Sequence, residues 1–112
     1  MQTRVLNGIG HFDIAGPNLG RLGDFYSAVL GWTATPRGPG YTQVSTPTGD
    51  GALVEAREPS FVIGIVVEDL DLALTKSVAA GGRIAMPRTD NGWVCKGQVT
   101  DPAGNLLTLI QA

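Results

Sequence analysis

Apolar side chains recur with the spacing of a helix in two segments of the chain, and each segment is bounded by residues that suit helix ends. Asn18 and Asp69 stand where helix N-caps are expected. Gly31 and Gly81 stand where the helices should end. The two apolar stripes are Leu19, Leu22, Tyr26, Val29 and Leu30, and Leu70, Ala73, Leu74 and Val78, with Ser77 on the same face.

Short strand-like runs surround both predicted helices. One run precedes each helix and three follow it, and the turn-forming segments 47–51 and 101–105 each separate the last two strands of a set. The sequence therefore predicts the order strand, helix, three strands, and predicts it twice. The predicted strands cover residues 10–15, 31–35, 41–45, 52–56, 61–67, 83–86, 93–99 and 106–111.

The two halves form an internal repeat. A shift of 51 residues aligns identical residues, among them Ile14 with Ile65, Leu19 with Leu70, Ala28 with Ala79, Gly31 with Gly82, and Ala34 with Ala85. The linker at residues 56–60 is too short to separate independent domains. We therefore predict a single domain over residues 1–112, built from one module at about 7–56 and another at about 60–112.

Composition narrows the class of partner. The net charge is −2, basic residues do not cluster, and no apolar run approaches the roughly 20 residues of a membrane span. We expect neither nucleic acid nor a membrane as a partner. Residues 1–10 lack the pattern of a signal peptide, so we expect a cytoplasmic protein. The single cysteine, Cys95, excludes an internal disulfide and a cysteine-rich zinc site.

Several segments together resemble the vicinal oxygen chelate superfamily, which includes glyoxalases and bleomycin-resistance proteins. They are His11-Phe12-Asp13-Ile14, Asn18-Leu19, Phe25-Tyr26, Leu30-Gly31-Trp32, Val67-Glu68-Asp69-Leu70, Ala80-Gly81-Gly82 and the closing stretch from Asp101 to Leu107. The resemblance implies an α+β fold in which two βαβββ modules form a curled mixed sheet, a half-barrel, around a pocket. It also implies a homodimer, since in many relatives each pocket draws one module from each of two chains.

Metal-dependent relatives hold their ion with a His on the first strand and a Glu on the last strand of each module. Carried over by position, His11 and Glu55 fill these places in the first module, whereas Val62 and Thr108 stand in the second. Valine cannot bind a cation and threonine is a weak ligand, so we expect no metal and no cofactor. Asp13 is the reservation, because it shares a strand face with His11 and could complete a three-ligand set.

The same residues are candidates for catalysis. A histidine with a neighbouring carboxylate can move a proton, so His11, Asp13 and Glu55 form the expected polar cluster. The alternatives are a structural histidine, a charge at the sheet rim and a solvated carboxylate. Tyr41 and Trp93 each follow a glycine and would either stack on a planar ligand or pack in the core.

The second module's equivalent face looks almost entirely apolar, with Val62 and Thr108 among its members. A pocket with one polar and one apolar wall is typical of small-molecule sites. The leading hypothesis is therefore a protein that binds a small organic molecule without metal. An isomerase, cyclase or lyase that uses His11 with Asp13 or Glu55 is the alternative, so whether the protein is an enzyme stays open. A metal-dependent lyase or dioxygenase ranks last.

Overall fold

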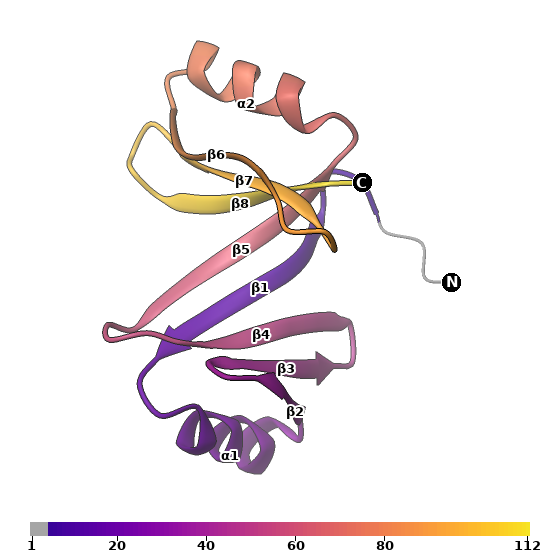
Figure 1. Cartoon of the computed structure of the whole chain (residues 1–112), viewed down its shortest axis with the longest axis vertical. Coiled ribbons are helices and arrows are strands. Elements are labelled where there is room, and N and C mark those ends of the chain that lie inside the picture. The colour runs from indigo at the N-terminus through magenta and orange to yellow at the C-terminus, as the bar shows by residue number, and fades with distance from the viewer. Residues whose placement is uncertain (1–4) are drawn as a thin grey trace. The chain divides into compact units, whose positions relative to one another are not determined.

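The computed structural model describes residues 5–112, so the first four residues of the predicted domain and of the segment inspected for a signal peptide lie outside it. The predicted α+β class and the twofold strand–helix–three-strand order are confirmed (Figure 1). The elements are β1 Ile9–Gly16, α1 Leu19–Leu30, β2 Thr33–Gly38, β3 Tyr41–Thr46, β4 Gly49–Glu55, β5 Ser60–Val67, α2 Leu70–Ala79, β6 Arg83–Asp90, β7 Cys95–Thr100 and β8 Leu106–Gln111. No helix in this part of the chain is long and apolar enough to cross a membrane.

The chain divides into two compact units, and the first covers His11–Val62. Its strands follow the order β2-β3-β4-β1, with β1 parallel to β4 and the other pairs antiparallel. Helix α1 covers one face of this sheet (Figure 1). The Asn18 side chain accepts a hydrogen bond from the Arg21 amide, and Gly31 closes the helix in the left-handed conformation, so both predicted caps are confirmed. The core under α1 comprises Ile14, Val44 and Leu53, with Phe12, Leu22, Tyr26 and Trp32 packed against them.

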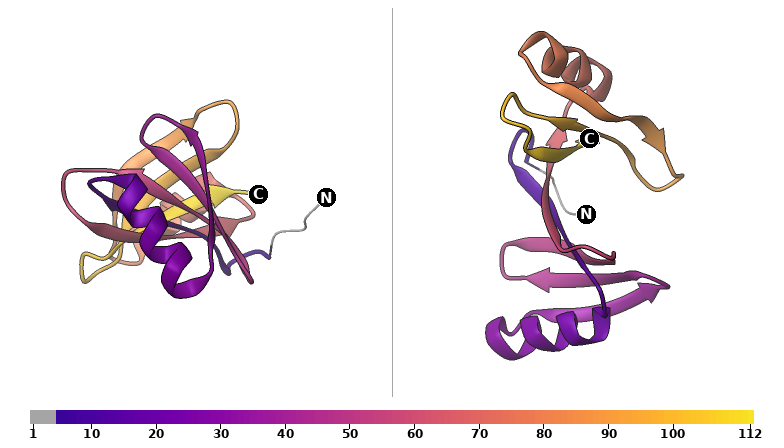
Figure 2. Two further views of the ribbon diagram at one scale, coloured as in Figure 1. Left: turned by 90° about the horizontal axis from the view of Figure 1, so that it is seen from below. Right: turned by 90° about the vertical axis from the view of Figure 1, so that its left-hand side faces the viewer.

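The second unit comprises Ile63–Ala112 with the described residues up to Gly10. Its strands follow the order β5-β8-β7-β6, and β5 is parallel to β8. Helix α2 lies along one face of this sheet (Figure 2) and is capped by the Asp69 side chain, as predicted. The core under α2 comprises Val67, Leu70, Leu74, Val99 and Leu109, and Cys95 packs against it.

The hairpin between β6 and β7 differs from the sequence prediction. Strand β6 extends to Asp90, and β7 begins at Cys95 rather than at Trp93. The cause is a turn made by side chains: the Asn91 carboxamide oxygen accepts from the backbone amides of Trp93 and Val94, at 3.0 and 2.9 Å. An Asn side chain that satisfies local amides takes them out of the strand ladder. Trp93 is consequently a loop residue.

Candidate functional site

Strand register determines which side chains share the face of the first unit's sheet that α1 does not cover. Asp13 on β1 lies beside Ala52 on β4, which lies beside Gln43 on β3. Side chains alternate along a strand, so His11 shares the face of Asp13. We call this surface the first-unit face; its members include His11, Asp13, Tyr41, Gln43, Ala52 and Val54. The opposite face carries the core residues under α1.

His11 and Asp13 are hydrogen bonded on this face, with 2.9 Å between imidazole Nε2 and carboxylate Oδ1. An ionised carboxylate can only accept, so Nε2 carries the proton. In the neutral imidazole, Nδ1 is then the free acceptor. Each side chain is 27% exposed, which leaves the pair accessible to a small molecule. Sequence reasoning placed these two residues together, and the structure does the same.

Tyr41 lies on the same face, opposite Val54. Its pKa is raised, first by burial of the phenol and second by the negative charge of Asp13. A raised pKa keeps the phenol protonated, so near neutral pH Tyr41 is a hydrogen-bond donor on a face whose other group, His11, offers an acceptor.

This electrostatic coupling gives a testable pH dependence. In the Tyr26→Phe background, which leaves Tyr41 as the only tyrosine, the phenol should titrate above the ordinary value of about 10. Adding Asp13→Asn should lower that pKa without restoring the ordinary value, because burial is the larger cause. As pH rises past the ordinary value the unfolded chain ionises first, so stability falls with increasing pH. Tyrosinate absorbance measures both midpoints, and equal midpoints would remove the coupling.

A second polar group on this face was not foreseen from the sequence. The Gln43 side chain accepts from Arg37 Nε at 2.9 Å and donates to Asp50 Oδ2 at 3.1 Å. The alternation of Tyr41 and Gln43 with buried Thr42 and Val44 was the available signal. The first-unit face is therefore polar across three strands.

Glu55 is not brought to His11 and Asp13. Glu55 lies beside Gly16 in the parallel β1–β4 pair, and it shares the face of Leu53 in the core under α1. Its Oε2 accepts from the backbone amide of Asn18 at 3.1 Å. It also lines an open hollow of about 490 Å³ on that side, together with Asn18, Asp24 and Thr42.

The second unit repeats the contact of Glu55. Gln111 is at the matching end of β8, beside Val67, and its Oε1 accepts from the Leu70 amide at 2.8 Å. Both side chains thus bind the backbone at the start of the helix in their own module, where free amides need acceptors. This shared role gives Glu55 a structural explanation that does not involve a ligand.

The second unit's face away from α2 is more polar than the sequence suggested. Gly64, Thr108 and Gln98 lie side by side on β5, β8 and β7, and the Gln98 amide donates to the Thr108 hydroxyl at 3.1 Å. The next row on the face contains Val66, Ile110 and Lys96. The apolar members were foreseen, whereas Lys96 and Gln98 were missed. Val62, the last residue of the first unit, is half-buried on β5, and its side chain offers no donor or acceptor atom.

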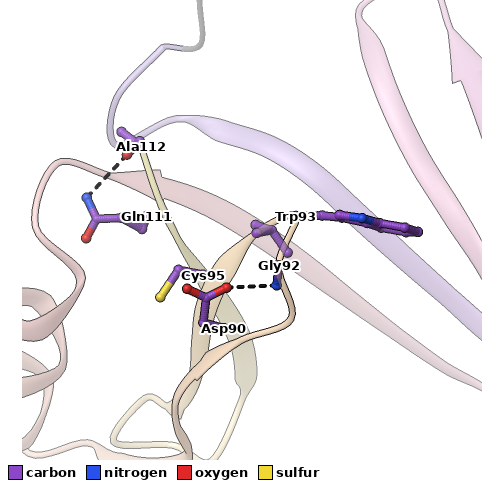
Figure 3. Close-up of a pocket in the computed structure, with 7 residues that line it drawn as sticks. Asp90, Gly92, Trp93, Cys95, Gln111 and Ala112 are labelled. Atoms are coloured by element: carbon purple, nitrogen blue, oxygen red, sulfur yellow. Dashed lines mark hydrogen bonds between the residues drawn. The ribbon is translucent and has the colours of Figure 1, made fainter.

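Trp93 does not occupy the position that corresponds to Tyr41. Its side chain is 94% exposed in the loop before β7. Figure 3 shows it at the edge of an open hollow of about 460 Å³, with Asp90, Cys95 and Gln111 among the other lining residues. By register, the counterpart of Tyr41 in the second unit is Lys96, since these residues lie opposite Val54 and Ile110, respectively.

The donors present do not fit the divalent metal of metal-dependent relatives. Between residues 5 and 112, no group of three His, Cys, Asp or Glu side chains is close enough to hold an ion. On β4 the residues that share the face of Asp13 are Asp50, Ala52 and Val54. Of these only Asp50 could coordinate, and its carboxylate instead accepts from the Gln43 amide. A stable site needs about four protein ligands, and His11 with Asp13 supplies two.

This fold, with a polar face on the sheet of its first unit, defines a two-module, glyoxalase-like protein. Residues 8–109 match the Glyoxalase/Bleomycin resistance protein/Dioxygenase superfamily, and the chain belongs to that family. A protein named as a glyoxylase, CFP32 of Mycobacterium tuberculosis, is 29% identical over 102 residues. That match covers 79% of this chain and 39% of CFP32, so the chain spans well under half of the curated relative.

Solved structures show the same fold. Methylmalonyl-CoA epimerase from Mycobacterium tuberculosis superposes with a TM-score of 0.73 at 18% identity, over 99% of this chain and 91% of the epimerase. A variant of methylmalonyl-CoA epimerase from Streptomyces coelicolor, in complex with 2-nitronate-propionyl-CoA, gives a TM-score of 0.69 at 20% identity, over 96% and 99% of the two chains. Identities this low establish the fold and leave the chemistry to the residues of the site.

Proposed function

We propose that this protein binds a small organic molecule on the first-unit face, without a metal ion. The observation that supports this most strongly is the hydrogen bond from His11 to Asp13, which leaves an imidazole acceptor on the same sheet face as the Tyr41 donor. A donor and an acceptor on one partly exposed face can orient a ligand that carries both a carbonyl and a hydroxyl or amine. The epimerase complex shows that this fold accommodates an organic ligand in a relative.

The test is a protein-detected NMR screen of small carbonyl and hydroxyl compounds. Because His11 is the only histidine, its imidazole signals report binding at this face without ambiguity. Compounds that bind should shift those signals, and Tyr41→Phe should lower the affinity of the protein for those compounds. Tyr26→Phe is the matched control, since Tyr26 packs in the core under α1. A screen in which no compound shifts the His11 signals would contradict the proposal.

A second candidate function is acid–base catalysis, which the same hydrogen bond favours. A carboxylate that holds Nε2–H orients the ring and stabilises the imidazolium that forms when Nδ1 takes a proton. His11 would be the base and Asp13 its orienting partner. The reaction class would be an isomerisation, cyclisation or lyase step that needs one proton moved.

The proposal includes a cytoplasmic homodimer. Helix α1 supports the dimer, because Phe25, Val29 and Leu30 remain 54%, 60% and 52% exposed, and apolar side chains in such numbers favour a protein partner. Light scattering should give twice the chain mass at micromolar concentration, and a monomer mass would contradict this part of the proposal.

A further inference from the structure

One charged side chain lies among apolar and neutral polar residues on the second unit's sheet. Lys96 on β7 is half-buried and lies between Ile110 on β8 and Thr89 on β6. Gln98 lies two residues further along β7 and is hydrogen bonded to Thr108. Antiparallel register and strand alternation place these side chains on the face that α2 does not cover.

Residues 5–112 supply no counter-charge for this ammonium. The ion pairs among residues 5–112 are His11 with Asp13, and Arg88 with Asp71 at 3.4 Å. Asp90, on the neighbouring strand, lies opposite Cys95 rather than Lys96, and its Oδ1 accepts from the Gly92 amide. A half-buried ammonium has lost part of its hydration, and an opposite charge is the most effective replacement.

The neighbours of Lys96 are suited to hold an anion as well. The Gln98 amide uses one hydrogen to donate to the Thr108 hydroxyl, so its second hydrogen remains available to donate to a ligand. Thr108 is only 3% exposed, and its position is fixed by the β5–β8 and β7–β8 ladders. Lys96 supplies up to three further donors, and no carboxylate shares its rows of the face.

We propose that the second unit's sheet face is an anion-binding site in which Lys96 pairs with a carboxylate or phosphate group of a small organic molecule, assisted by the Gln98 amide that Thr108 holds in place. The site lies wholly within the second unit, so it does not depend on ligand binding at His11. Its chemistry separates organic anions from neutral molecules of the same shape.

The test uses benzoate, its neutral twin benzamide, and phenyl phosphate, added to isotope-labelled full-length protein. Benzoate or phenyl phosphate should shift the Lys96 backbone and Gln98 side-chain signals in NMR spectra, and benzamide should not. The anion that binds more tightly shows whether the site prefers a carboxylate or a phosphate. Lys96→Met should weaken binding by about 10- to 100-fold, the effect of losing a charged hydrogen-bond partner. Lys96→Arg should retain most of the affinity.

The chain offers a matched control, since Lys76 is its only other lysine and lies exposed near the end of α2. Lys76→Met removes the same charge away from the sheet face and should leave binding unchanged. The inference is overturned if benzamide shifts the signals as strongly as benzoate, if neither anion shifts them, or if the two methionine variants weaken binding equally. The His11 signals, followed in the same spectra, report separately on the first-unit face.

Discussion

His11→Gln is expected to lower turnover by roughly 10²–10⁴-fold for any compound that the wild-type protein isomerises, cyclises or cleaves. Glutamine keeps a polar side chain of similar reach, but it cannot accept and release a proton near neutral pH. Asp13→Asn should lower turnover as well, because the carboxylate that holds Nε2–H is replaced by a neutral amide. Steady-state kinetics of the three proteins measure both losses.

Glu55→Gln is the control for this prediction. Its amide oxygen can still accept from the Asn18 backbone amide, and Glu55 lies on the opposite face of the sheet from His11. Turnover should therefore stay at the wild-type level. A loss in Glu55→Gln as large as that in His11→Gln would place Glu55 in the reaction, and an unchanged rate in His11→Gln would leave binding as the only function.

Gly51→Ala is expected to destabilise the fold by about 3 kcal/mol, the combined effect of overpacking and of displacing a buried ring. Gly51 is buried on β4, and a methyl group there would overlap the Phe12 ring. That ring packs between Trp32, at 5.5 Å between centroids, and Phe61, at 6.0 Å. Displacing it breaks both contacts. Thermal denaturation should show a midpoint lowered by about 10 °C or more.

Gly20→Ala is the matched control for the glycine substitution. In α1 the added methyl group would make only an ordinary contact, at 3.6 Å from the Asn18 side-chain oxygen. Alanine is the better helix former by about 1 kcal/mol, so this variant should be neutral or slightly more stable. In a Phe12→Leu background, Gly51→Ala should cost less. Equal costs in the two backgrounds would show that the ring is not the obstacle.

Local signals predicted the helices well. Asn18, Gly31 and Asp69 act at the helix ends through side-chain or backbone conformations that depend only on near neighbours, so spacing along the sequence was sufficient to find them. The start of β7 was missed because it depends on hydrogen bonds that the Asn91 side-chain oxygen accepts from the Trp93 and Val94 amides. The sequence around Trp93 is compatible both with this side-chain turn and with an extended strand, so it does not show which of the two forms.

The site was harder to predict, because its composition depends on which side chains of each strand point to the face that the helix does not cover. On β4, apolar residues occupy both faces, Leu53 on one and Ala52 and Val54 on the other, so alternation gave no direction for Glu55. On β1, His11 and Asp13 are two residues apart, and the alternation of side chains along a strand was sufficient to place them on the same face. Alternation along β3 could have placed Gln43 on this face. Its hydrogen-bond partners, and the neighbours of Lys96, required the register between strands, which a single sequence does not specify.

We infer that His11 is held by Asp13, rather than by a metal ion, on a face open to a small organic molecule. The most direct measurement is nitrogen NMR of the single imidazole, recorded before and after addition of zinc, nickel or manganese. We expect a proton on Nε2, a free Nδ1 and no change in the imidazole signals at stoichiometric metal. Near-stoichiometric metal binding that moves the imidazole signals, and that Asp13→Asn abolishes, would contradict it.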